Sequence, residues 1–259
     1  MADDLHKKRS NFRAFRRLAT SLLKAIGRCR DANCAATSIR EVIEQRNSIG
    51  PALGRKGAEL VQPHDKLLIF SQSRRVVQLL QGVAPGIQDT CRVYVAECRP
   101  KSPEPFRDAC DYCEALRSTG YSITLIPDAA AGNLVQRGEI GKVFLGAHGV
   151  FLDARRHPRY VVNTCGSWGI IVAAEKAGIP VYVVTEADKL ETMPKKGVDG
   201  VTSYEEVGDV TSYEQEENIF PNVDLRSSFA ASGRSVGTLN VGYDICEVLG
   251  NVTIVTEKN

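Results

Sequence analysis

Short apolar segments alternate with helical patterns from Lys66 onward, and this alternation constrains the fold most strongly. We expect six strands, at Lys66–Phe70, Arg92–Ala96, Ser122–Ile126, Lys142–Leu145, Val181–Val184 and Val252–Val255. Helices are expected between them, at 74–81, 105–119, 132–137 and 167–177. Because this order is typical of a parallel sheet with helices on both faces, we predict an α/β fold with a Rossmann-like sheet.

The first 62 residues have a purely helical pattern. Apolar residues recur at helical spacing between residues 5 and 26, with Arg and Lys on the remaining face. Two further helices are expected at 35–44 and 52–61, separated by a break at residues 48–51 that contains Gly50 and Pro51. We therefore predict a helical N-terminal region at 1–62 and an α/β domain at 63–259, with an exposed acidic loop inserted near 195–222.

Composition and segment hydropathy indicate a globular protein. The chain is 43% hydrophobic and 25% charged, which is enough apolar content for a substantial core. No stretch approaches 18 apolar residues and the first ten residues are polar, so we expect neither a membrane span nor a secretory signal, and a cytoplasmic location. The eight cysteines have no regular spacing, which favours reduced thiols over disulfides.

The net charge of +2 conceals an asymmetry along the chain. Residues 1–56 hold 13 Lys and Arg against 5 Asp and Glu, whereas residues 185–224 hold 3 against 11. A basic helix can bind nucleic acid, but a solvated helical face explains the same pattern. Since no part of the chain resembles an RNA-binding motif, we do not expect a nucleic-acid partner.

In a parallel sheet, the loops at the carboxyl ends of the strands converge on one edge. Here these loops are rich in hydroxyls and arginine, as in Ser71-Gln72-Ser73-Arg74 and Glu97-Cys98-Arg99-Pro100. Helices that begin at Ser73 and Gly166 would aim backbone N–H groups at the same edge, which suits a phosphate or carboxylate. The sequence therefore predicts an anion-binding site there.

Several segments carry a family resemblance in consistent order over residues 66–259: FSQSR (70–74), ECRP (97–100), GAHGV (146–150), VNTCGS (162–167) and YDICEV (243–248). With these segments the chain resembles the family of translation initiation factor 2B alpha, beta and delta subunits, which also contains methylthioribose-1-phosphate and ribose-1,5-bisphosphate isomerases. The N-terminal region lacks the arginine-glycine-alanine phosphate motif that the resemblance leads us to expect.

The resemblance also identifies two positions that separate catalytic from non-catalytic members. The isomerases have a cysteine after the first strand and an aspartate after the fourth, which move a proton between C1 and C2 of the sugar. Ser71 and His148 take these places here. Serine is a far weaker acid than a thiol, whereas an imidazole can act as a base near neutral pH.

We therefore predict a non-catalytic regulatory or scaffold subunit that binds a sugar phosphate or nucleotide. The alternative is an aldose–ketose isomerase of a phosphorylated pentose with a rearranged site that uses His148, Ser71, Asp128 or Cys98. Because members of the family associate, we expect a homodimer or an assembly with related subunits.

No cofactor or metal is expected, since the Cys110-x-x-Cys113 spacing falls within a predicted helix.

The isomerases have asparagine-lysine before the helix that opens with glycine, and this chain has Asn163-Thr164. The ammonium that would balance a phosphate is thus absent at that position. The expected ligand-binding residues are Ser71, Ser73, Arg74, Arg99, Asn163, Thr164, Gly166 and Ser167.

Two alternatives near this site stay open from the sequence. The segment 153–159 contains three arginines and a histidine that either restore positive charge at the site or form a solvated loop. Cys98 and Cys165 either have lowered pKa values and are reactive, or are buried and inert.

Overall fold

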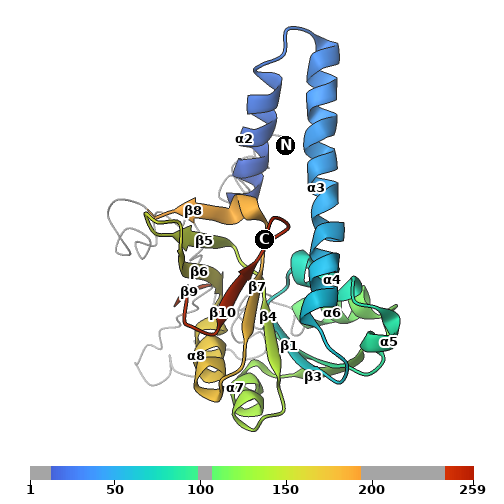
Figure 1. Ribbon diagram of the computed structural model, residues 1–259, viewed down its shortest axis with the longest axis vertical. Helices are drawn as coiled ribbons and strands as arrows, with labels where there is room; N and C mark the ends of the chain where they lie inside the picture. The colour runs from blue at the N-terminus through green and yellow to red at the C-terminus, as the bar shows by residue number, and fades with distance from the viewer. Residues whose placement is uncertain (1–12, 99–106, 194–242) are drawn as a thin grey trace, which may run out of the picture.

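The structure is a computed structural model, and it describes residues 13–98, 107–193 and 243–259 (Figure 1). In these residues a six-stranded sheet is flanked by helices on both faces, and a smaller second sheet lies beside it. Two N-terminal helices, α2 (Arg13–Ile26) and α3 (Ala32–Leu60), rise from this body as a helical hairpin.

The main sheet has the order β10-β7-β4-β1-β2-β3, and all of its paired strands are parallel. The six strands confirm the predicted bounds: β1 (Lys66–Phe70), β2 (Arg92–Ala96), β3 (Ser122–Ile126), β4 (Lys142–Leu145), β7 (Val181–Val184) and β10 (Val252–Val255). The order changes direction between β1 and β4, so the topological switch point, where α/β sheets bind ligands, lies at the ends of these two strands.

Each face of the main sheet has its own apolar core. On β1, Leu67 and Ile69 pack with α3, α4 (Arg74–Gln81) and α6 (Arg107–Leu116), while Leu68 and Phe70 pack on the opposite face with α7 (Asp128–Gln136) and α8 (Ser167–Ala177). This alternation follows from the two-residue period of a strand. The α/β class predicted from the sequence is therefore confirmed.

The predicted helices at 74–81 and 167–177 are confirmed with their bounds, and α6 lies inside the predicted 105–119. The prediction for α7 was late by four residues, because the helix begins at Asp128 directly after Pro127. A carboxylate in the first turn interacts favourably with the positive end of the helix, which explains the earlier start. A short helix, α5 (Pro85–Gln88), precedes β2.

The predicted break near Pro51 was wrong, since α3 runs through it as one helix of 29 residues. Tertiary packing explains the difference. Leu53 is fully buried, and a Cβ at Gly57 would lie 2.1 Å from the carbonyl oxygen of Leu79 in α4. Only glycine allows the two helix backbones to approach so closely, and this packing outweighs the cost of about 3 kcal/mol for a proline inside a helix.

The second sheet, which has the order β8-β5-β6-β9, was not predicted from the sequence. Its strands are β5 (Gly149–Leu152), β6 (Pro158–Thr164), β8 (Leu190–Thr192) and β9 (Tyr243–Glu247). The segment 153–159, for which the sequence left open a solvated loop or a source of positive charge at the site, forms the tip of the β5–β6 hairpin and the first residues of β6. Val150 and Val161 join this sheet to the core that contains α7 and α8.

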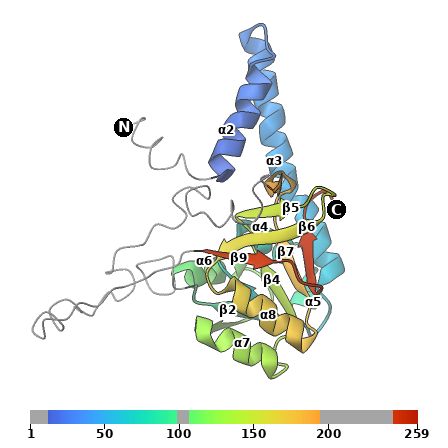
Figure 2. The same cartoon turned by 90° about the vertical axis from the view of Figure 1, so that its left-hand side faces the viewer.

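The helical arm, defined as α2 together with residues 32–48 of α3, projects away from both sheets (Figures 1 and 2). The C-terminal part of α3, in contrast, lies in the core of the main sheet through Ile49 and Leu53. The division of the chain at residue 62 stays a prediction. Among the described residues, no helix has the length and apolar character needed to cross a membrane.

Candidate functional site

Two residues that follow neighbouring strands have left-handed backbone conformations. Ser71, after β1, has φ 66°, and Cys98, after β2, has φ 56°. Residues other than glycine rarely adopt this region, and those that do gather at functional sites where surrounding contacts hold them. The carboxyl edge of β1 and β2 is therefore the candidate site.

Every polar group of Ser71 has a partner. Its hydroxyl lies 2.5 Å from the hydroxyl of Thr164, and its backbone N–H donates to the Cys98 sulfur at 2.8 Å. Its carbonyl accepts a hydrogen bond from the Tyr112 hydroxyl at 2.8 Å. Ser71 is 1% exposed and Thr164 is fully buried. The structure thus uses the Ser71 side chain to hold Thr164 against the end of β1.

Asp128 and Cys98 form the next contact along this edge. The Asp128 carboxylate accepts the Cys98 N–H at 2.8 Å, and the Cys98 thiol donates to the Ala96 carbonyl at 3.3 Å. Asp128 begins α7 after β3, three strand positions from β4, which corresponds to about 14 Å at ordinary strand spacing. Asp128 is therefore brought to Cys98 rather than to the end of β4.

His148 follows β4 on the other side of Ser71. The His148 ring meets the Tyr243 ring edge to face, with centroids 4.4 Å apart, and the His148 backbone N–H donates to the Val162 carbonyl at 2.8 Å. Tyr243 is the cross-strand partner of Thr164. Ser71 and His148 thus converge on one pair of residues, Thr164 and Tyr243. His148 is partly exposed.

The N-terminus of α8 carries a carboxylate of the chain itself. Asp244 in β9 accepts hydrogen bonds from the N–H groups of Gly166 and Trp168 at 2.8 and 2.9 Å. Gly166 has φ 102°, and a Cβ there would lie 2.8 Å from the Phe70 ring, so the turn requires glycine. A phosphate at this terminus, as predicted from the sequence, would have to compete with Asp244.

Asn163 and Ser167 brace the turn between β6 and α8. The Asn163 amide donates to the Ser167 hydroxyl at 2.9 Å, which in turn donates to the Thr164 carbonyl at 2.7 Å. Both residues are buried. These contacts explain the local fold of the segment, and the ligand-binding roles of Asn163 and Ser167 stay predictions.

Cys165 has a raised pKa of about 11, because burial and the adjacent Asp244 carboxylate both disfavour the thiolate. Of the two alternatives left open by the sequence, this result favours a protonated, unreactive thiol. The positive end of α8 would by itself lower the pKa of Cys165. Its effect is outweighed because the Asp244 carboxylate is bound at this helix terminus.

Ser73 caps α4 as the sequence predicts for a helix start. Its hydroxyl accepts the Val76 N–H at 3.4 Å, and its own N–H donates to the Tyr112 hydroxyl at 2.8 Å. A Cβ on Gly146 would lie 2.6 Å from the Ser73 Cβ, so glycine at this position lets the β4 loop reach the start of α4.

Arg74 and Arg75 differ in direction by one helical step of about 100°. Arg74, the predicted ligand, is exposed on the first turn of α4. Arg75 turns toward the sheet, where its Nε donates to Glu186 Oε1 at 2.7 Å and its Nη1 donates to Gln78 Oε1 at 2.7 Å. Arg75 was not predicted from the sequence. The sequence did contain one indication of such a residue. Glu186 follows the buried strand β7 along the chain, and a carboxylate in that position requires a cationic partner.

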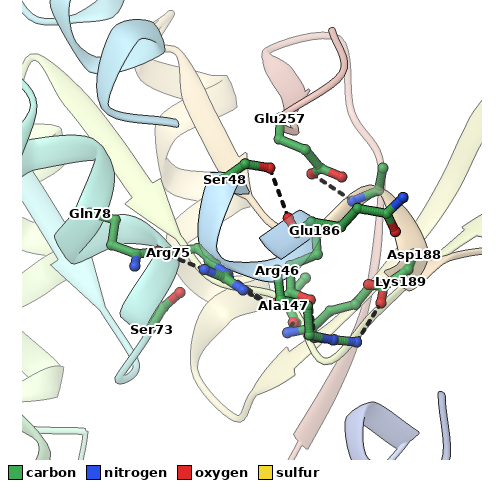
Figure 3. A network of polar contacts seen from close by, with 12 residues as sticks. Arg46, Ser48, Ser73, Arg75, Gln78, Ala147, Glu186, Asp188, Lys189 and Glu257 are labelled. Atoms are coloured by element: carbon green, nitrogen blue, oxygen red, sulfur yellow. Dashed lines mark hydrogen bonds and ion pairs between the residues drawn. The ribbon is translucent and has the colours of Figure 1, made fainter. Parts of the chain in front are cut away.

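Glu186, which follows β7 (Val181–Val184) along the chain, lies at the centre of a polar network (Figure 3). Arg46 of α3 donates to Glu186 Oε2 at 3.1 Å and to Asp188 Oδ2 at 2.9 Å. Asp188 belongs to a short 3-10 helix, η2 (Ala187–Lys189), whose Lys189 donates to the Ala147 carbonyl at 2.9 Å, next to His148. Burial alone would raise the pKa of Glu186, but the hydrogen bond and charge of Arg75 lower it.

Some predicted features lie outside the described residues. They are Arg99, the acidic loop near 195–222 and the first part of the basic N-terminal helix. Within residues 13–98, 107–193 and 243–259, no three His, Cys, Asp or Glu side chains are placed so that they could hold a metal ion. The CxxC pair lies in α6, where Cys110 is exposed and Cys113 is partly buried.

The fold and the site define an α/β protein whose candidate site lies at the switch point of a parallel sheet. The model of the initiation factor 2 subunit family matches residues 9–258, so the chain belongs to this family.

The chain is also similar in sequence to methylthioribose-1-phosphate isomerases. The identity is 26% over 164 residues for that of Fervidobacterium nodosum, 29% over 166 for Syntrophotalea carbinolica and 25% over 214 for Thermotoga neapolitana. These matches cover 61%, 61% and 80% of this chain and 44%, 45% and 56% of the relatives. The chain spans about half the length of the curated relatives it matches.

Solved structures share the fold. The translation initiation factor eIF-2B of Pyrococcus horikoshii OT3 has a TM-score of 0.65 and 20% identity, with 94% of this chain and 74% of that chain covered. The 5-methylthioribose 1-phosphate isomerase of the same organism has a TM-score of 0.66 and 17% identity, with 95% and 65% covered. The tetrameric eIF2B-beta2-delta2 complex of C. thermophilum reaches 0.51 at 17% identity, with 71% and 59% covered.

Proposed function

We propose that this chain is an aldose–ketose isomerase of a phosphorylated pentose, of the methylthioribose 1-phosphate or ribose 1,5-bisphosphate type, with a rearranged active site. One observation carries the proposal: Ser71 and His148, which follow the two strands at the switch point, converge on the pair Thr164 and Tyr243. The similarity to methylthioribose-1-phosphate isomerases supports the same substrate class.

His148 is the residue that we assign to proton transfer. Isomerisation of a cyclic sugar 1-phosphate breaks the ring bond between C1 and oxygen, moves the hydrogen from C2 to C1, and moves the proton of the C2 hydroxyl to the former ring oxygen. The hydrogen transfer from C2 to C1 requires a base that can also return the proton. An imidazole titrates near neutral pH and can do both steps, and the edge contact with Tyr243 fixes its ring. Ser71 is buried and bonded to Thr164, so we assign it to shaping the site rather than to acid chemistry.

The phosphate would bind at the start of α4. Its first turn presents the positive end of the helix, and the exposed Arg74 adds a full charge beside it. The other predicted terminus, at α8, holds the Asp244 carboxylate and is less suited to an anion. Asp128 would support the site by fixing Cys98, whose sulfur accepts the Ser71 N–H.

Ligand binding and turnover together test this proposal. Methylthioribose 1-phosphate and ribose 1,5-bisphosphate should raise the melting temperature by several degrees at about 100 times Kd, since ligand at that excess stabilises the fold by about 2.7 kcal/mol. Ribose 5-phosphate and inorganic phosphate serve as comparison ligands. The sugar phosphate that stabilises the protein should also be converted to its ketose form. No conversion of any of these sugars would reject the isomerase.

A second candidate is a non-catalytic regulatory or scaffold subunit that binds a sugar phosphate or nucleotide and assembles with a second copy or with related subunits. It is favoured by the serine at the position where the isomerases have cysteine, and by the carboxylate on α8. The C. thermophilum relative of similar fold is described as a tetrameric complex. Stabilisation by a ligand without turnover would support this candidate.

A further inference from the structure

One buried carboxylate joins two helices at the edge of the candidate site. Glu186 is 8% exposed, and its two carboxylate oxygens bind different guanidinium groups: Oε1 binds Arg75 of α4 and Oε2 binds Arg46 of α3 (Figure 3). Arginine suits this geometry because its planar, permanently charged group donates several hydrogen bonds at once. A buried charge of this kind is costly to leave unpaired, so the three side chains act as one unit.

The same segment reaches the residues beside His148. Directly after Glu186, η2 ties the Ala187 N–H to Glu257 Oε2 at 2.9 Å and the Lys189 ammonium to the Ala147 carbonyl at 2.9 Å. Asp188 adds a second contact to Arg46. The polypeptide between β7 and β8 therefore touches α3, the C-terminal segment and the loop that carries His148.

Arg46 lies where the helical arm meets the part of α3 that packs on the body. Below it, α3 is fixed to α4 by close backbone packing at Gly54 and Gly57. The packed part of α3 continues through Pro51 to Gly50 and Ile49, which are buried against the body about one turn after Arg46. Above it, the arm projects from the body (Figure 2). The contact of Arg46 with Glu186 and Asp188 thus fixes the direction in which the arm leaves the core.

We propose that Glu186 is a positioning residue that fixes the posture of the helical arm relative to the ligand site through Arg46, while Arg75 holds Glu186 in place. The link to the ligand site rests on the proposed function. The link to the arm does not, because it follows from the contacts of Glu186 alone. We call Arg46, Glu186 and Arg75 together the clamp. The segment that the clamp holds also contacts the Ala147 carbonyl next to His148 through Lys189, so loosening the clamp should weaken ligand binding more than it slows the chemical step.

Hydrogen exchange of the full chain tests the clamp without any ligand. The Arg46→Met variant keeps the Arg75–Glu186 pair and removes only the contact to the arm. We expect residues 32–48 to exchange at least tenfold faster than in the unaltered chain, while residues 52–60 keep their protection. The matched control is Glu139→Gln, which removes an exposed ion pair with Lys66 at 3.0 Å. Unchanged exchange at 32–48 in Arg46→Met would overturn the proposal.

Two further variants separate positioning from general stability. Glu186→Gln keeps the size of the side chain and loses its charge, and it should loosen the same residues as Arg46→Met. Arg46→Lys keeps the charge and should restore part of the protection. If Glu186→Gln instead loosens β7 and α4 and leaves 32–48 protected, Glu186 serves the core alone and the proposal fails.

Enzyme kinetics then test the link to the ligand site. Arg46→Met should raise KM about tenfold and change kcat less than threefold, because His148 and its Tyr243 contact are untouched. A loss of kcat at unchanged KM would contradict a positioning role. If the unaltered chain converts no sugar phosphate, the proposed function fails, and the exchange measurement still decides the clamp.

Discussion

The hydroxyl oxygens of Ser71 and Thr164 lie 2.5 Å apart, between two buried residues that come from the ends of β1 and β6. Each hydroxyl is the other's partner at a place with little access to water. Replacement of one residue leaves a buried polar group unsatisfied, whereas replacement of both removes the pair together.

We predict that Ser71→Ala and Thr164→Val each lower the free energy of unfolding by about 1–3 kcal/mol, and that the double variant loses less than the sum. Urea unfolding of the four proteins measures this coupling. Additive losses would show that the two hydroxyls do not depend on each other.

Gly166 and Gly169 should respond in opposite directions to alanine. Gly166 has a left-handed backbone and faces the Phe70 ring, so Gly166→Ala should destabilise the protein by several kcal/mol. Gly169 lies inside α8, and a Cβ added there would meet no atom within 4 Å, so Gly169→Ala should stabilise the protein by about 1 kcal/mol. Thermal unfolding of the two variants gives the signs. A neutral Gly166→Ala would contradict the described turn.

The Cys165 thiol should become more reactive when Asp244 loses its charge. Burial and Asp244 together raise the pKa of this thiol to about 11, so Asp244→Asn should lower the pKa and increase the thiolate fraction at about pH 8. Iodoacetamide labelling followed by peptide mass spectrometry should show faster modification of Cys165. The exposed Cys110 in the same sample provides the reference rate. An unchanged ratio of the two labelling rates would show that Asp244 is not the cause of the raised Cys165 pKa.

The arm should loosen in acid. Burial acts to raise the pKa of Glu186, but Arg75 and Arg46 outweigh it and lower this pKa. A carboxyl group with a lowered pKa stabilises the fold above its unfolded pKa of about 4.3, and this contribution is lost as the pH falls through the folded value. Protection of residues 32–48 should therefore persist at pH 5 and fall below about pH 4. Loss of protection between pH 7 and pH 5 would point to another group.

The main sheet could be predicted from sequence because each of its strands is a short apolar run enclosed by helical segments. The second sheet could not, since β6 pairs with β9 about 80 residues away and β8 has three residues. Pairing over such a distance leaves no local pattern. The continuity of α3 through Pro51 was also missed, because it depends on glycine contacts with α4 rather than on helix propensity.

The strand-end position of the candidate site could be predicted from topology, but the direction of individual side chains could not. Arg74 and Arg75 are adjacent in sequence, and only the phase of α4 decides that Arg75 meets Glu186. In the same way, the carboxylate that raises the pKa of Cys165 comes from Asp244, 79 positions along the chain. Electrostatics at this site depends on partners that the local sequence does not contain.

Isomerisation in D2O, followed by proton NMR of the product, tests the central claim most directly. If His148 moves hydrogen between C2 and C1, the unaltered protein should form ketose phosphate with solvent deuterium at C1. His148→Asn should slow conversion by a factor of about 100 or more. The control is His157→Asn, at an exposed histidine near the tip of the β5–β6 hairpin, and it should keep the original rate. Equal rates for the unaltered protein and His148→Asn would contradict the account.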